Sequence, residues 1–158
     1  MSNWLSLNKE EQITLFTKAG AETGLPPFAI EKDAWVTFVL RMLFSSALSE
    51  HIVFKGGTAL SKVYNLIERF SEDVDLAISR EYFGFDGELT KGMIRKLRRA
   101  SHTFTLHQLP ELLTEQFNNY GIRPELYDIS VPNTRISDQD PEILFIVDIP
   151  EQTEHPIR

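Results

Sequence analysis

Two aspartates one residue apart are the first feature of this chain that could do chemistry. Asp73 and Asp75 lie in a segment, residues 73–79, where polar and apolar residues alternate, which favours a β-strand. On a strand both carboxylates project to one side, roughly 6–7 Å apart. Such a pair repels itself, and Mg²⁺ or Mn²⁺ would remove the repulsion while leaving coordination positions for phosphate oxygens. The pair predicts a catalytic metal site for phosphoryl transfer.

A pair of glycines upstream supplies a complementary feature. Gly56 and Gly57 follow a short β-rich run, residues 51–55, and precede apolar residues at helical spacing over 60–67. Glycines let the backbone approach a polyphosphate closely, and the positive end of the following helix attracts its charge. Thr58 adds a hydroxyl donor. The turn therefore predicts a binding site for the phosphates of a nucleoside triphosphate (NTP).

Each half also has an ordinary structural explanation, as a tight turn or a solvated strand face, and only the combination discriminates. A P-loop is excluded because no glycine directly precedes Lys62, and the spacing also excludes G-x-G-x-x-G. Lys62, one helical turn after Thr58, points either toward the phosphates or toward water. Lys55 is a further candidate for a phosphate-binding cation.

The segment that carries these residues resembles a known family. FKGGTALSKVYNLIERFSEDVDLAI, residues 54–78, is similar to the signature of the AbiEii/AbiGii-type nucleotidyltransferase toxins, a branch of the nucleotidyltransferase superfamily. That signature pairs Gly-Gly-Thr and a helix with Arg-x-Ser-x-Asp-x-Asp. The similarity extends more loosely over residues 30–33 and 138–142. Most of the chain thus resembles the N-terminal half of such proteins.

The resemblance implies roles for individual residues. Gly56, Gly57 and Thr58 would contact the triphosphate, and Asp73 and Asp75 would bind the metal. Two further residues match the Arg-x-Ser positions of the family and could contact phosphate, although a capped turn would also explain them: Arg69 and Ser71.

The resemblance also implies an activity and a biological setting. The expected reaction is transfer of a nucleoside monophosphate (NMP) from an NTP to an RNA, such as a tRNA, or to a protein acceptor. The expected setting is a toxin–antitoxin or phage-defence pair, in which an antitoxin protein is encoded alongside the toxin. Composition and spacing do not by themselves indicate either.

Part of the family pattern is not matched by this sequence. A third carboxylate normally lies on a further strand, and the candidate is Asp148 in the apolar run 143–149, where an aspartate that merely ends a buried strand is the alternative. The family adds a lysine and a late aspartate in its C-terminal half, and neither appears. We therefore expect a chain that is truncated at its C-terminal end. A catalytically inactive nucleotide-binding or protein-interaction module is the alternative to an active enzyme.

The charge of the chain restricts its partners. A net charge of -7 argues against a protein that coats nucleic acid, so any basic site must be local. One such site is a run of cations that on a helix would bind RNA phosphates or an acidic protein, unless it is simply solvated: Lys91, Arg95, Lys96, Arg98 and Arg99. Four aromatics are expected in the core, Phe83, Phe85, Phe104 and Phe117, although Tyr82 or Phe83 could stack a nucleobase.

The elements that must position these residues can be predicted from periodicity and punctuation. Helices are expected from about residue 8 to 24, with Leu15 and Phe16 in the buried stripe, and over 28–47, with Phe44 facing the core. After the 51–79 region, a mostly helical stretch over 89–119 has a break near Pro110, and strands are expected over 126–131 and 143–149. The predicted fold is α/β (α+β), a small mixed β-sheet flanked by helices. An N-terminal helical cap, residues 1–50, precedes a minimal nucleotidyltransferase core, residues 51–158, in one structural domain.

The composition excludes several other classes of site. The chain has no cysteine, so disulfides, thiolate zinc sites and cysteine nucleophiles are ruled out. No apolar segment reaches the ~18–20 residues needed to span a bilayer, and the N-terminus lacks a secretory signal. A cytoplasmic protein is expected.

Overall fold

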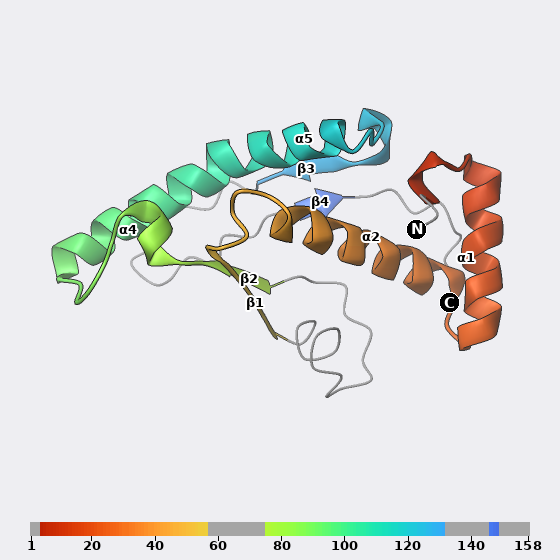
Figure 1. Cartoon of the computed structure of the whole chain (residues 1–158), viewed down its shortest axis with the longest axis horizontal. Coiled ribbons are helices and arrows are strands. Elements are labelled where there is room, and N and C mark those ends of the chain that lie inside the picture. The colour runs from red at the N-terminus through yellow and green to blue at the C-terminus, as the bar shows by residue number, and fades with distance from the viewer. Residues whose placement is uncertain (1–3, 57–74, 132–145, 149–158) are drawn as a thin grey trace. The chain divides into compact units, whose positions relative to one another are not determined.

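The computed structural model describes residues 4–56, 75–131 and 146–148, which belong to two compact units. The first unit holds the described residues 4–56 and 75–79. The second holds residues 80–131 and 146–148. Figure 1 labels the helices and strands of both.

Two helices that pack against each other at a steep angle dominate the first unit, α1 (Lys9–Thr23) and α2 (Pro27–Phe44) (Figure 1). Asn8 caps α1 by accepting a hydrogen bond from the Glu11 N–H, and the Glu11 carboxylate accepts one from the Asn8 N–H. This reciprocal capping box satisfies backbone donors that the first helical turn cannot use. Gly24 ends α1 in a left-handed conformation, φ 75°, and Pro27 opens α2. The predicted start and stop of the first helix are confirmed.

The core of the first unit is built on aromatic rings. Trp4, in a 3₁₀ turn (Trp4–Ser6), meets Phe16 and Trp35 edge to face, with ring centroids 5.5 Å and 4.9 Å away. Gln12 is buried beside them, and its Nε2 donates to the Trp4 carbonyl at 3.0 Å.

Two residues expected in this core are exposed instead, Leu15 by 40% and Phe44 by 39%. The buried positions of α1 are Gln12, Phe16 and Gly20, at i, i+4 and i+8. Because a hydrogen bond to the Trp4 carbonyl satisfies the Gln12 amide nitrogen, a polar residue can occupy the stripe assigned to apolar ones.

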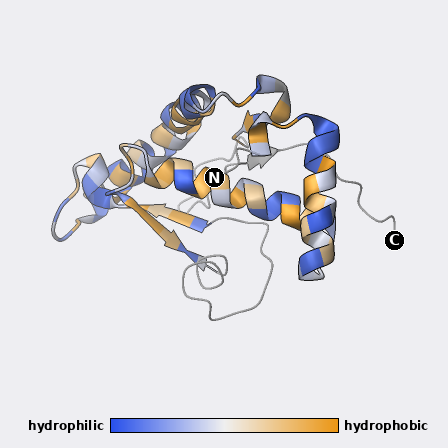
Figure 2. Ribbon diagram, turned by 45° about the vertical axis from the view of Figure 1, so that its right-hand side comes forward, coloured by the Kyte–Doolittle hydropathy of each residue, from blue (hydrophilic) through white to orange (hydrophobic). Residues whose placement is uncertain are grey.

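The first unit also contains an antiparallel ladder of β1 (Ile52–Lys55) and β2 (Asp75–Ile78). Ile52 pairs with Ile78 at one end and Lys55 with Asp75 at the other. The Ser79 N–H donates to the His51 carbonyl at 2.7 Å, which extends the ladder by one step. Figure 2 shows that both strands are mainly hydrophobic. Both strands were predicted, and both are confirmed.

A long helical rod forms most of the second unit (Figure 1). It consists of α4 (Lys91–Thr103), a π-helical segment (Phe104–Gln108) and α5 (Leu109–Asn119). Pro110 has no N–H, and its ring would clash with a carbonyl one α-turn earlier. The wider turn carries the chain past it, with the Leu109 N–H bonded to the Phe104 carbonyl. The expected interruption is therefore a widened turn and not a helix end.

A second antiparallel ladder, β3 (Asp128–Ser130) with β4 (Ile146–Asp148), completes the described part of this unit. β3 packs on α5. Phe117 of α5 is fully buried, and its ring centroid lies 4.5 Å from that of Tyr127. Phe104 is also buried, whereas Phe83 and Phe85, which were expected in the core with them, are half-buried.

The predicted α+β class is confirmed. Within residues 4–56, 75–131 and 146–148, the strands form two separate two-stranded antiparallel ladders, so no parallel pairing of a mixed sheet is found among them. The division into a cap and a core at residue 50 stays a prediction. None of the helices in the described ranges is long and apolar enough to cross a membrane.

Candidate active site

The pairing of β1 with β2 brings the glycine turn and one of the two aspartates together. Lys55, the last residue of β1, lies opposite Asp75, the first residue of β2, and Gly56 follows Lys55 directly. An antiparallel arrangement puts the end of one strand beside the start of the other. The two parts of the predicted site are therefore neighbours in the first unit.

The contact between Gly56 and Asp75 is unusually close. A Cβ atom added to Gly56 would lie 2.8 Å from Cγ and 3.0 Å from Cβ of Asp75, and closer still to Oδ2. Gly56 also has φ 77°, a left-handed conformation that side chains disfavour. Glycine is required at this position for both reasons, and in this structure it is the aspartate that uses the space left by the missing Cβ.

Lys55 adds a cation to the same corner. Residues directly opposite each other in an antiparallel ladder have Cβ atoms roughly 4.5–5.5 Å apart and project to the same face. Lys55 and Asp75 are both exposed, so each can reach a ligand from solvent. From the sequence, Lys55 is only a further candidate. Its position opposite Asp75 follows from the register of β1 and β2. The sequence pattern of the two strands does not by itself predict that register.

The other predicted phosphate-binding and metal-binding residues of this region lie outside the described residues, and their roles stay predictions: Gly57, Thr58, Lys62, Arg69, Ser71 and Asp73. Asp148, the candidate third carboxylate, is in β4 of the second unit, where its backbone pairs with Asp128. Its role as a metal ligand likewise stays a prediction.

The donor chemistry at the turn fits a hard divalent cation. Asp75 offers an exposed carboxylate, and carboxylate oxygens are the protein ligands that Mg²⁺ prefers. Gly56 contributes no side chain that would block an ion or a phosphate. Among the residues that the structure describes, no group of three histidine, aspartate or glutamate side chains that could hold a metal is found.

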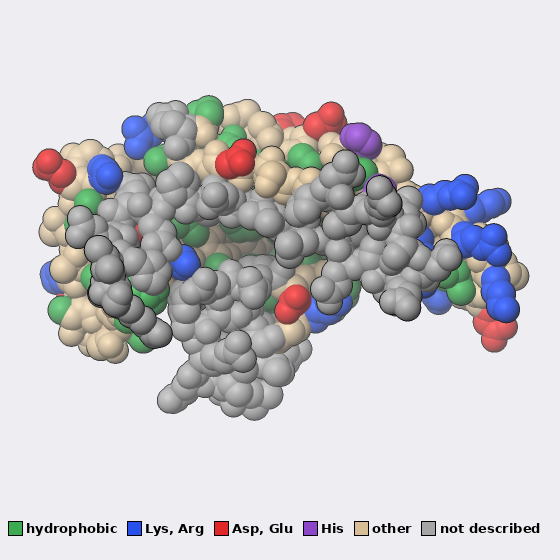
Figure 3. All heavy atoms as spheres, turned by 180° about the vertical axis from the view of Figure 1, so that it is seen from behind, with side chains coloured by type: hydrophobic (Ala, Val, Ile, Leu, Met, Phe, Trp, Pro, Cys, Tyr) green, Lys and Arg blue, Asp and Glu red, His purple; other side chains and the backbone are tan. Residues whose placement is uncertain are grey.

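The predicted basic run is confirmed as helical. All five of its cations lie on α4, where Lys91, Arg95, Lys96 and Arg99 are exposed and Arg98 is half-buried. Figure 3 shows Lys and Arg side chains gathered over this helix. A concentrated positive surface on a chain of net charge -7 marks a place where an anionic partner would be attracted.

A comparison with protein families identifies the chain. A family model described as "Nucleotidyl transferase AbiEii toxin, Type IV TA system" matches residues 38–157, which include the glycine turn, both aspartates and the basic helix. No match was found among curated proteins, and none among solved structures. Because the match covers most of the sequence, this chain belongs to the AbiEii family of nucleotidyl transferase toxins.

Proposed function

We propose that this protein is a metal-dependent nucleotidyltransferase that transfers NMP from an NTP to an RNA acceptor, as the toxin of a type IV toxin–antitoxin system. Membership of the AbiEii family supports the reaction class and the biological setting. The contact between the Asp75 carboxylate and Gly56 is the structural observation that carries the proposal, because it joins a metal-ligand type to a glycine turn.

The glycine turn would bind and orient the triphosphate. Backbone N–H groups of Gly56, Gly57 and Thr58 would hold the β- and γ-phosphates, with the Thr58 hydroxyl as a further donor. Lys55, directly before the turn, would offset negative charge on the phosphates. Further contacts to phosphate come from residues proposed on the family signature: Lys62, Arg69 and Ser71.

Asp73 and Asp75 would hold Mg²⁺ or Mn²⁺, with Asp148 as a candidate third ligand. When bound, the ion supplies charge neutralisation at the triphosphate. The positioning residues would keep the α-phosphate in line with an acceptor hydroxyl. The hydroxyl oxygen forms a bond to the α-phosphorus and loses its proton to solvent, the bond to the bridging oxygen breaks, and pyrophosphate leaves.

The partners follow from family and charge. A type IV toxin–antitoxin family implies a cognate antitoxin. The cations of α4 favour RNA over a protein as the acceptor, because closely spaced phosphates match a basic helix face. A cytoplasmic location would give the enzyme access to both NTPs and RNA.

The test is an incubation of the full chain with each α-labelled NTP, Mg²⁺ and total RNA. We expect label on RNA with the natural chain and none with Asp75→Asn. Asp86→Asn, which changes an exposed carboxylate in a loop of the second unit, is the matched control and should retain activity. Absence of label on RNA with every NTP would contradict the proposal.

The alternative is a module that binds nucleotide without turning it over. Equilibrium binding of Mg-NTP separates the two functions. Binding that depends on Asp75 without any label transfer would favour the module, whereas binding together with transfer favours the enzyme.

A further inference from the structure

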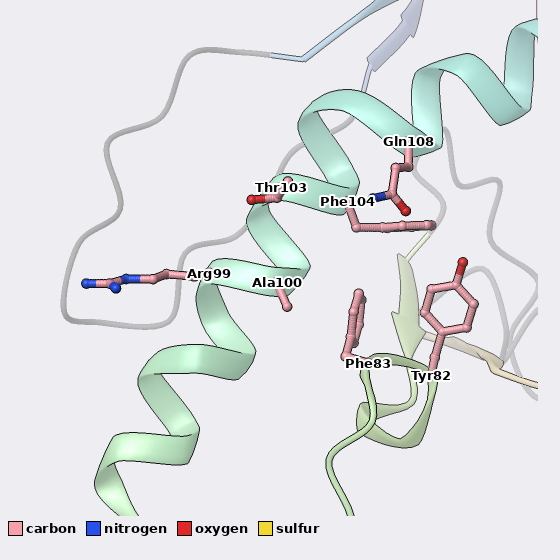
Figure 4. Close-up of a pocket in the computed structure, with 7 residues that line it drawn as sticks. All are labelled: Tyr82, Phe83, Arg99, Ala100, Thr103, Phe104 and Gln108. Atoms are coloured by element: carbon pink, nitrogen blue, oxygen red, sulfur yellow. The ribbon is translucent and has the colours of Figure 1, made fainter.

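The second unit contains a pocket that the proposed reaction does not use. It has a volume of about 420 Å³ and lies where the 3₁₀ turn (Arg80–Phe83) packs on α4 and the π-helical segment. Its aromatic side is formed by Tyr82, Phe83 and Phe104, and its polar side includes Thr103 and Gln108 (Figure 4). The pocket therefore combines ring surface with hydrogen-bonding groups.

The three aromatic rings contact one another edge to face. Ring centroids are 5.2 Å apart for Tyr82 and Phe83, 5.3 Å for Tyr82 and Phe104, and 5.7 Å for Phe83 and Phe104. Phe104 is only 3% exposed and anchors the cluster, while Tyr82 and Phe83 are half-buried. Ring surface thus remains accessible on a rigid support, and a flat aromatic ligand can stack there.

The polar side of the pocket suits the edge of a nucleobase. Gln108 is exposed and belongs to the π-helical segment, and in Figure 4 its amide and the Tyr82 hydroxyl both point into the space beside the rings. An amide carries both donors and an acceptor, the combination that base edges require.

The surroundings of the pocket are basic. Arg99 lines it, yet Figure 4 shows the Arg99 guanidinium directed away from the rings. On the same helix, Lys91, Arg95 and Lys96 are exposed. A ligand that stacks in the pocket would therefore carry its negative charge outside it, along α4. A nucleic-acid strand with one unpaired base fits this arrangement, because the base is an uncharged ring and the negative charge lies on the phosphates beside it.

We propose that the second unit binds single-stranded RNA, with phosphates along α4 and one unpaired nucleobase stacked in the pocket of Tyr82, Phe83 and Phe104. The proposal rests on RNA as the acceptor of the proposed transferase, and adds how the strand is held. Unstacked bases on aromatic side chains beside a positive track are the general means by which proteins bind single strands.

The proposal can be tested by fluorescence anisotropy of the full chain with two labelled RNA strands. The strands have equal length, and one is normal while the other is abasic. Both strands carry the same phosphates, so only the base contact differs. We expect the abasic strand to bind about fivefold or more weakly. Phe83→Leu should remove this difference. Arg95→Gln should weaken both strands equally and reduce the salt dependence, and Lys18→Gln, an exposed cation of α1, should change neither.

Equal binding of the normal and abasic strands by the natural chain would overturn the proposal. If circular dichroism shows that Phe83→Leu is misfolded, Gln108→Ala replaces it. This exposed variant should alter preference among homopolymeric RNAs and leave the abasic strand unaffected. No change in preference would again count against a base pocket. Mononucleotides that bind more tightly than RNA, and lose binding in Phe83→Leu, would assign the pocket to a free nucleotide and overturn the RNA proposal.

Binding is measured without NTP or metal, and also on Asp75→Asn. A failure of nucleotidyl transfer therefore leaves the RNA measurement intact. Conversely, transfer of NMP by a chain that binds normal and abasic RNA equally would support the proposed function and contradict the base pocket.

Discussion

The carboxylate of Asp75 lies in the space that a side chain on Gly56 would occupy. The two residues are far apart in sequence and meet because β1 ends where its antiparallel neighbour β2 begins. A change at the glycine must therefore move the acid. Gly56 therefore helps to position the Asp75 carboxylate, in addition to connecting β1 to the residues that follow.

Gly56→Ala is expected to be more destabilising than an ordinary glycine-to-alanine change. The left-handed backbone alone costs about 1–2 kcal/mol. The added methyl group would also press on Cγ and Cβ of Asp75, so rotation of the carboxylate does not relieve the contact and the strand must shift, at a further cost of roughly 1–3 kcal/mol. Chemical denaturation of the variant and the natural chain measures the difference.

Gly84→Ala is the matched control for that experiment. Gly84 has φ 76°, nearly the same as Gly56, but no atom lies within 4 Å of the position that an added methyl group would take. It reports the backbone cost alone. Equal losses of unfolding free energy in the two variants would show that the contact with Asp75 carries no cost.

Asp75→Asn should reduce nucleotidyl transfer by at least about 100-fold, since it removes a charged ligand at the site of the transferring phosphate. The free energy of unfolding should change little, because the side chain is exposed. Addition of EDTA should abolish transfer by the natural chain, and excess Mg²⁺ should restore it. Transfer that continues in EDTA would contradict a metal-dependent mechanism.

Lys55→Gln should raise the KM for NTP about fivefold, which corresponds to the roughly 1 kcal/mol of an exposed charge interaction. The value of kcat should change less, because a contact to a phosphate that does not react stabilises the enzyme–NTP complex and the transition state equally. Steady-state kinetics at two salt concentrations measures this, since an exposed charge effect weakens with salt. Lys18→Gln is the control, because it removes one positive charge far from this position in the sequence. An equal rise in KM in this variant would show that the effect of Lys55→Gln comes from net charge alone.

Asn8→Ala should lower the free energy of unfolding by about 0.5–2 kcal/mol, the usual range for loss of an N-cap. Both hydrogen bonds of the capping box join Asn8 and Glu11. Glu11→Gln should have a smaller effect, because glutamine can occupy the same position of a capping box. A larger loss in Glu11→Gln than in Asn8→Ala would locate the stabilisation in the charge of Glu11 near the helix start.

Local signals predicted much of the fold. Asn8, Gly24 and Pro27 fix helix boundaries through backbone chemistry that involves only neighbouring residues, and α1 and α2 begin where these residues require. The buried faces were harder to predict. Gln12 is buried because of a partner eight residues away, and Leu15 is exposed because Trp4 packs on a different side of α1. The spacing of apolar residues in a sequence does not reveal tertiary contacts of this kind.

The candidate site shows the same limit. Residue types alone indicated that an aspartate and a glycine would cooperate, since carboxylates and glycines suit metal and phosphate. The position of Lys55 opposite Asp75 depends on strand register, which single-sequence periodicity does not give. The pocket of Tyr82, Phe83 and Phe104 depends on the packing of a 3₁₀ turn on a helix, which composition does not encode.

The widened turn before Pro110 changes the rotational phase of the rod that follows it. In an uninterrupted α-helix, Phe104 and Leu113 would project about 180° apart around the axis. One extra residue taken up by the π-helical segment reduces that angle by about 100°. The two buried residues can then turn toward a common side, and Gln108 is exposed. Deletion of one residue from this segment would thus leave a regular α-helix in which the two halves of the rod keep the same rotational phase.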